Sequence, residues 1–136
     1  MADPLTLLHP AGRGILATIK RDGRPQLSNV AYAWDGTTVR VSVTDDRAKT
    51  HNMRRDPRVA LEVTTPDLGG YVVVEGEADL TPVAAEPYDA TVDELVDVFR
   101  AIGGEHDDWD DYRAAMVRDR RLVLRLRPTH SYGWAP

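Results

Sequence analysis

The chain has 136 residues, the size of one domain, and is 42% hydrophobic and 29% charged, an ordinary composition for a soluble globular protein. Its formal net charge of -5 opposes binding to the phosphate backbone of nucleic acids, and the absence of cysteine excludes disulfides, thiolate nucleophiles and cysteine-based metal sites. No apolar run approaches the roughly 20 residues of a membrane span, and no signal-peptide pattern is present. We therefore expect one cytoplasmic domain over residues 1–136, with no metal, nucleic-acid or membrane partner.

The first part of the chain predicts a short helix followed by an antiparallel meander. Asp3-Pro4 is a typical helix start, and Gly12 to Gly14 is expected to end that helix. Asp-Gly turns then separate runs of alternating residues, many of them β-branched. Three strands are predicted: 15–20, 25–34 and 39–44.

A basic helix is predicted from Asp45 to Arg58. Asp45 or Asp46 is expected to cap its start, and Asp56-Pro57 to end it. A surface helix gains more from acids in its first turn, where the backbone N–H groups point outward and the dipole is positive. Because basic side chains stand there instead, the segment predicts a local anion site, with a solvated helix held by surface ion pairs as the alternative. The first-turn residues are Arg47, Lys49 and Thr50.

The second part predicts further strands and two helices. Thr91 and Glu94 form a capping-box pattern at the first helix, which Gly103-Gly104 is expected to end. Gly76 is expected to mark a bulge or a barrel corner. The predicted segments are strands at 59–64, 71–80 and 120–127, helices at 91–102 and 108–119, and an edge segment at 130–134. This order predicts a mainly β fold, a small antiparallel barrel with helical additions.

Polar residues inside the predicted strands are the second candidate for function. Gln26 and Ser28 share one face of the second strand, Asn29 lies on the other, and Ser42 is in the third. Serine and asparagine favour strands poorly, so these positions indicate a ligand, or else a solvent-facing strand. If the meander pairs these strands, Gln26, Ser28 and Ser42 would face a flat ligand together. The histidines lack zinc-site spacing, and no nucleophile elbow or phosphate-binding loop is present.

Several short motifs occur together in an order that resembles a known family. They are similar to the split β-barrel flavin and deazaflavin oxidoreductases related to pyridoxamine phosphate oxidase, and within that group to the actinobacterial branch that uses coenzyme F420. The resemblance runs from about Gly14 to Gly133. Its motifs are Ala17-Thr18-Ile19-Lys20, Asp22 to Val30, Arg47-Ala48-Lys49-Thr50, Arg54 to Arg58, Glu75-Gly76, Gly104-Glu105-His106, Asp108 to Arg113 and His130-Ser131-Tyr132-Gly133.

The resemblance implies a homodimer of six-stranded split barrels with two cofactor sites at the subunit interface. Lys49, with Arg47 and Thr50, would meet the cofactor phosphate, and tail carboxylates would pair with Arg54, Arg55 or Arg58. The positions implied to line the ring and its linker are Gln26, Ser28, Asn29, Ser42 and Val43. Those implied to approach from the partner subunit are Gly70, Tyr71 and the tail from His130 to Trp134.

The expected activity is hydride transfer from reduced coenzyme F420 to an unsaturated small organic substrate. The alternatives are an FMN-binding protein like pyridoxamine phosphate oxidase, and a non-catalytic protein that binds or carries F420. The Arg-x-His segment with which the oxidases bind pyridoxal phosphate is absent, which argues against vitamin oxidase activity. We assign no catalytic residue, because Tyr71, His130 and solvent are equally open as the proton donor, and the sequence does not specify the substrate.

Overall fold

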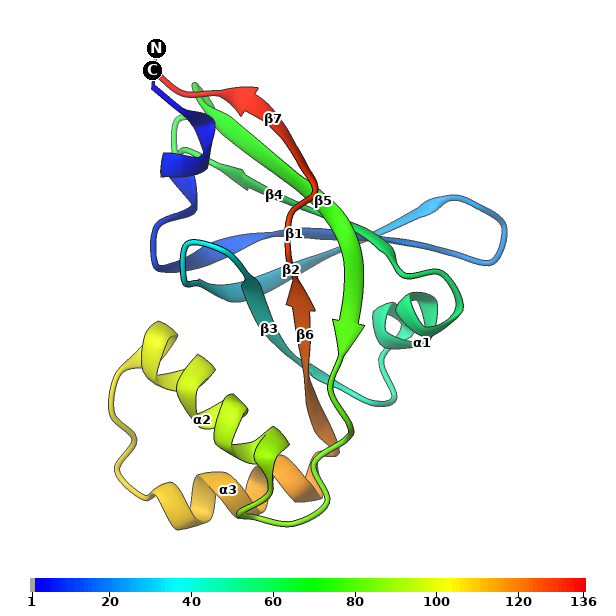
Figure 1. The fold of residues 1–136 in the computed structure, drawn as a ribbon, viewed down its shortest axis with the longest axis vertical. Helices are drawn as coiled ribbons and strands as arrows, with labels where there is room; N and C mark the ends of the chain where they lie inside the picture. The colour runs from blue at the N-terminus through cyan, green and yellow to red at the C-terminus, as the bar shows by residue number, and fades with distance from the viewer. Residues whose placement is uncertain (1) are drawn as a thin grey trace.

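The computed structural model describes residues 2–136 and contains seven strands, three α-helices and one 3₁₀ helix (Figure 1). Of the helices in this range, none is long and apolar enough to cross a membrane. In chain order the elements are η1 (Pro4–Leu8), β1 (Ala11–Ile19), β2 (Pro25–Trp34), β3 (Val39–Thr44), α1 (Ala48–Arg55), β4 (Arg58–Thr64), β5 (Tyr71–Leu80), α2 (Ala90–Gly103), α3 (Trp109–Arg118), β6 (Arg121–Leu126) and β7 (His130–Trp134).

Six of the strands close into an antiparallel barrel. They are hydrogen-bonded in the order β4-β1-β2-β3-β6-β5, and pairing of β4 with β5 completes the circle. The predicted edge segment forms β7, which pairs with the first half of β5 from Tyr71 to Glu75. The structure confirms the mainly β, six-stranded split barrel that the sequence and the resemblance predict, and adds β7 at its side.

The barrel is open between β2 and β3. β1 and β2 pair over nine residue pairs, whereas β2 and β3 pair only at Ala33–Arg40 and Trp34–Val39. β3 pairs with β6 along its whole length, and the hairpin of β1 and β2 extends away from β3 (Figure 1). The edges of β2 and β3 that face each other there have no ladder between them. The predicted meander is therefore confirmed in full between β1 and β2, and between β2 and β3 only at the Trp34 end.

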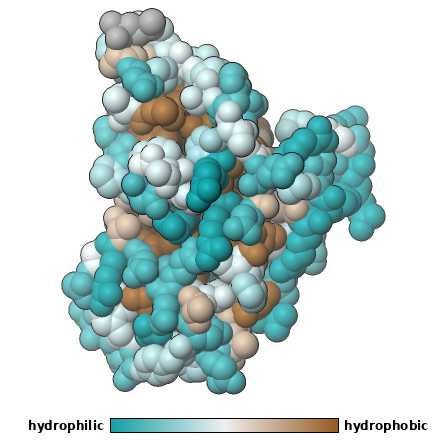
Figure 2. All heavy atoms as spheres, viewed as in Figure 1, coloured by the Kyte–Doolittle hydropathy of each residue, from teal (hydrophilic) through white to brown (hydrophobic). Residues whose placement is uncertain are grey.

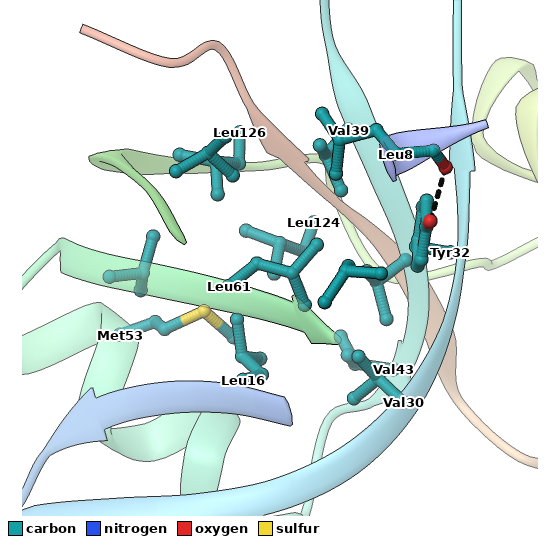
Figure 3. Packing of buried hydrophobic residues seen from close by; sticks show 14 of the residues in the cluster. Leu8, Leu16, Val30, Tyr32, Val39, Val43, Met53, Leu61, Leu124 and Leu126 are labelled. Carbon is teal, nitrogen blue, oxygen red and sulfur yellow. Dashed lines mark hydrogen bonds between the residues drawn. The ribbon is translucent and has the colours of Figure 1, made fainter. Parts of the chain in front are cut away.

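The barrel interior is filled by the apolar side of each strand (Figure 3). Tyr32 is fully buried, its hydroxyl donates to the Leu8 carbonyl, and burial raises its pKa to about 12. Met53 of α1 reaches the same cluster and plugs the end of the barrel. Each fully buried Leu or Val contributes about 1.5–3 kcal/mol relative to an exposed one, so this cluster is the main source of stability.

A second apolar cluster joins α2 and α3 to the outer side of β6 through Val123. The predicted capping box of α2 is wrong. Asp89 is the cap and accepts from the Val92 amide at 2.8 Å. Thr91 instead donates to the Pro82 carbonyl at 2.9 Å, and Glu94 accepts hydrogen bonds from Arg125 and Arg40. Hydrogen bonding to Arg125 lowers the pKa of Glu94, so this carboxylate ties α2 to β6 and β3.

Two further glycine predictions have different outcomes. The opening helix ends at Leu8, and the glycines expected to end it lie inside β1, which begins at Ala11. A Cβ on Gly14 would lie 2.6 Å from the Glu62 carbonyl oxygen, so the glycine permits close approach of β4. Gly76 is confirmed at a barrel corner, where β5 changes partner from β7 to β6 and a Cβ would lie 2.7 Å from the Arg127 carbonyl oxygen.

Candidate functional site

The start of α1 lacks a side-chain cap. The N-cap residue is Arg47, which makes no capping hydrogen bond, so the expectation that Asp45 or Asp46 caps the helix is wrong. Asp45 is instead in ion pairs with Arg54 at 2.6 Å and Arg120 at 2.9 Å, and Asp46 accepts from the Thr44 hydroxyl. The helix begins without a protein anion at its positive end, as an anion site requires.

Three cations converge on this helix start. Burial lowers the pKa of Lys49, and the charges of Arg47 and then Arg121 lower it further. Arg121 is the first residue of β6 and pairs with Thr44, the last residue of β3. The sequence analysis missed Arg121, although it placed a strand there, because only the partner of that strand brings it to the site.

Thr50 holds the end of β3 against α1. The residue is fully buried, and its hydroxyl donates to the Thr44 carbonyl at 2.7 Å. Its hydroxyl hydrogen therefore already takes part in a hydrogen bond within residues 2–136. Direct contact of Thr50 with a phosphate stays a prediction, while its structural role is to fix the turn that presents Arg47 and Lys49.

Gln26 and Ser28 lie on the barrel side of β2, not on a solvent-facing side. The Gln26 side-chain oxygen accepts from Asn52 of α1 at 2.7 Å, and Asn52 also donates to Thr18. The Ser28 Oγ atom is buried and is the only buried side-chain nitrogen or oxygen within residues 2–136 that has no hydrogen-bond partner. Leaving such a hydroxyl unpaired costs about 1–3 kcal/mol, so Ser28 marks a place where a ligand would offset that cost.

The predicted polar row across β2 and β3 does not form. β2 and β3 separate after Arg40, so Ser42 has no partner in β2; it pairs with Val123 of β6, and its Oγ accepts from Arg121 Nη1 at 3.2 Å. The Val43 side chain is in the barrel core, so only its backbone is available to a ligand. Asn29 lies on the outside of the barrel and lines a separate surface cavity of about 530 Å³.

The remaining predicted residues lie on β5, on β7 and in the loop before β5, away from the start of α1. Tyr71 pairs with Thr64 and Trp134, and His130 pairs with Glu75. Gly70 is buried, and its amide donates to the Thr65 hydroxyl at 2.9 Å. Within one chain these residues contribute nothing to the helix start, so their predicted place at the cofactor depends on a second subunit.

The other arginines of the basic segment already have partners. Arg54 is paired with Asp45, and Arg58 with Asp56 at 2.8 Å. Arg55 donates to the Ile19 carbonyl at 2.7 Å and to Asn52 at 2.9 Å. The part of the surface-helix alternative that expects ion pairs therefore holds for Arg54 and Arg58, while Arg47 and Lys49 differ from them.

Two surface cavities lie beside the start of α1 and beside β2. One of about 460 Å³ adjoins the helix start and is lined by basic residues, Arg47 and Arg121 among them, and by the acidic Asp46 and Asp119. A larger one of about 570 Å³ lies between β2 and α2, but none of the predicted site residues lines it, and its Arg40 is paired with Asp35 and Glu94. Among residues 2–136 no group of three or more potential metal ligands gathers.

Comparison with known proteins identifies relatives over the whole fold. The family model for pyridoxamine 5'-phosphate oxidase matches residues 5–135. A solved structure described as an F420 reductase is 28% identical, with a TM-score of 0.74, over 97% of this chain and 98% of that one. A conserved hypothetical protein from Mycobacterium tuberculosis is 24% identical, with a TM-score of 0.75, over 98% and 84% of the two chains.

A third structure shows how widely the fold is used. A heme-binding protein from Mycobacterium smegmatis is 19% identical, with a TM-score of 0.70, over 95% of this chain and 51% of that one. At that identity the likeness extends to the fold alone. The ligand of this chain must therefore be argued from its own residues.

Proposed function

The chain belongs to the pyridoxamine 5'-phosphate oxidase family, and from that premise we propose that it is an oxidoreductase of the actinobacterial branch that transfers a hydride from reduced coenzyme F420 to an unsaturated small organic substrate. The observation that carries the proposal is a cationic helix start beside a barrel opening that holds an unpartnered hydroxyl. The 28% identity to an F420 reductase across nearly all of both chains supports F420 over other ligands.

The residues present fit a cofactor that joins a flat ring to a phosphate. Arg47 and Lys49 supply positive charge at the start of α1, where charge-assisted hydrogen bonds to phosphate are strong. The opening between β2 and β3 supplies backbone groups outside any ladder, and Ser28 supplies an unused hydroxyl. A ligand that reaches from the start of α1 to Ser28 would meet positive charge at one end and neutral hydrogen-bonding groups at the other.

In the proposed reaction the deazaflavin supplies the hydride, and the protein supplies binding and orientation. Arg47 and Lys49 hold the phosphate, and Thr50 fixes the turn that presents them. Ser28 orients the ring from β2, and Gln26, held by Asn52, does so beside it. The apolar core behind this strand edge, which includes Val30 and Val43, keeps water out of the barrel interior.

The proposed active form is a homodimer. The outer face of β1, β2, β4, β5 and β7 exposes large apolar side chains, which a monomer rarely groups together. The register aligns Ile15 with Glu62, Val73 and Tyr132 across four strands, so these side chains lie on one surface. The members of this dimer face with large exposed side chains are Ile15, Leu27, Tyr71, Tyr132 and Trp134. A second copy covering it would also bring Gly70, Tyr71 and His130 near the other subunit.

A titration of the purified protein with F420 and with FMN, followed by fluorescence, tests the proposal. We expect F420 to bind more tightly than FMN, and Lys49→Ala to weaken F420 binding at least about tenfold, because it removes a charged hydrogen-bond donor. Lys20→Ala is a matched control, since Lys20 is an exposed lysine in the turn between β1 and β2. Unchanged affinity in Lys49→Ala would contradict the phosphate assignment.

Turnover separates the enzyme from its alternatives. Reduced F420 is mixed with the protein and a panel of enones and quinones, and its oxidation is followed by absorbance. Catalysed oxidation of the cofactor supports the proposed activity. Tight binding without oxidation across the panel would indicate a carrier, and tighter binding of FMN than of F420 would indicate an FMN protein.

A further inference from the structure

Arg121 stands out among the basic residues by its position and its lack of an acidic partner. It is partly buried at the junction of α3 and β6, opposite the end of β3. Within residues 2–136, no ion pair joins Arg47, Lys49 or Arg121 to a carboxylate, in a chain with 22 acidic and 17 basic residues. The neighbouring Arg120, by contrast, pairs with Asp45 at 2.9 Å.

The three unpaired cations act on one another. Burial lowers the pKa of Lys49, and the charges of Arg47 and Arg121 lower it further. Bringing like charges together in a partly buried place is unfavourable, and an anion among them reverses the sign of that interaction. Arg47 and Arg121 also line the same surface cavity of about 460 Å³ at the helix start, together with Asp46 and Asp119. The charges and the cavity point to one place.

Arg121 has a second contact that links this place to β3. Its Nη1 atom donates to the Ser42 hydroxyl at 3.2 Å, and the guanidinium carries further donors in a planar fork. An anion bound by the remaining donors would therefore be held in a fixed relation to Ser42. A lysine at this position would lack the planar fork, and a glutamine would lack the charge.

We propose that Arg121 is the third cation of an anion site formed with Arg47 and Lys49, and that it positions a phosphate group relative to Ser42 of β3. The inference rests on the proposed function in that this phosphate would belong to the cofactor. It assigns to the α3–β6 junction a part in ligand binding, so the site is built from three separate stretches of the chain: β3, the start of α1 and the start of β6.

The test uses inorganic phosphate, which has no ring and is independent of the cofactor. Thermal unfolding of the whole protein is measured against phosphate concentration, with sodium chloride at equal ionic strength as reference. A ligand that binds the folded state alone raises the unfolding midpoint. We expect a phosphate-specific rise in the wild type, and an apparent affinity at least about tenfold weaker in Arg121→Gln, from loss of a charged hydrogen bond.

Control variants separate position from charge. Arg127→Gln removes an exposed arginine just beyond the end of β6, far along the strand from α1, and is expected to bind phosphate like the wild type. Arg121→Lys keeps the charge but not the fork, and is expected to bind with intermediate affinity. If Arg121→Gln responds to phosphate like Arg127→Gln, or if the wild type responds no more than to chloride, the inference is overturned.

Chemical-shift mapping on the wild type keeps the test open should Arg121→Gln not fold. On addition of phosphate we expect the amide signals of Ser42, Ala48, Lys49 and Arg121 to move. Movement confined to residues elsewhere would contradict the inference. A titration with F420 then distinguishes the two proposals. If the protein responds to phosphate but does not bind F420, Arg121 stays in the anion site and the proposed function is contradicted. If Arg121→Gln binds F420 as tightly as the wild type, the proposed function stands and the role of Arg121 is contradicted.

Discussion

The two edges of β2 differ in how far they are paired with a neighbouring strand. The edge next to β1 is paired at nine residue pairs, while the edge next to β3 is paired at two. The β1 side continues through β4 to β5 and encloses a core of fully buried side chains such as Leu16 and Leu61. The β3 side leaves backbone edges apart and ends at α1, where cations lack acidic partners. Backbone pairing is therefore complete on one side of β2, whereas unsatisfied binding groups lie on the other.

The distribution of apolar residues on the surface follows the same division in part. The face drawn in Figure 2 is largely hydrophilic, with hydrophobic spheres in small separate patches. The register brings the large exposed apolar residues onto the outside of the well-paired strands instead, on the proposed dimer face. The completed side of the barrel thus has two apolar surfaces, an inner one that folds the chain and an outer one that we propose joins two copies.

Truncation of the core on the paired side should have the largest effect. Leu61 of β4 is fully buried between β1 and β5, so Leu61→Ala removes apolar contacts and leaves a cavity. We expect a loss of about 2–5 kcal/mol in the free energy of unfolding, measured by urea denaturation. Leu68→Ala, at a residue that is 78% exposed, should change it by less than about 0.5 kcal/mol. Similar losses in the two variants would contradict the position of the core.

The outer surface of the same strands should show the next effect. Tyr132 is 47% exposed on β7 and makes an edge-to-face contact with Tyr71. Aromatic residues at the centre of an interface often contribute about 2 kcal/mol, so we expect Tyr132→Ala to weaken the dimer about thirtyfold. Sedimentation velocity over a range of protein concentrations measures this. Tyr88→Ala is the control, because Tyr88 is exposed beside α3, away from this face. A wild type that sediments as a 15.1 kDa monomer would remove the dimer proposal.

Local patterns were sufficient to predict most of the paired side. β2 and β5 begin and end at the predicted residues, because alternating side chains and flanking turns define a strand within its own sequence. β1 was placed four residues short, since Gly12 and Gly14 resemble a helix stop. Their reason for being in a strand lies elsewhere, in the approach of Tyr32 and of the Glu62 carbonyl.

The open side depends on contacts that the sequence does not reveal. Asp45 and Asp46 resemble helix caps, but long-range partners changed the outcome, since Asp45 binds Arg120, 75 residues away. Glu94, which was predicted to cap α2, likewise accepts a hydrogen bond from Arg125 of β6 instead. The charge pattern and the predicted helix start were enough to place Arg47 and Lys49 together. To place Arg121 beside them, one must know that β6 pairs with β3. A site assembled from distant segments is predicted only as far as strand pairing is.

The smallest expected effect, and the one with the opposite sign, concerns Ser28 on the open side. Ser28→Ala removes a buried hydroxyl that has no partner within residues 2–136, so we expect the free energy of unfolding to rise by about 1 kcal/mol without ligand. The same change should weaken F420 binding by up to about tenfold, because the ring loses a hydrogen bond. Ser131→Ala, at an exposed serine of β7, should leave the free energy of unfolding unchanged and is the control for that quantity. Urea denaturation and fluorescence titration measure the two. A loss of stability in Ser28→Ala would mean that the hydroxyl is already satisfied, by water for example, and that the barrel opening holds no unused donor for a ligand.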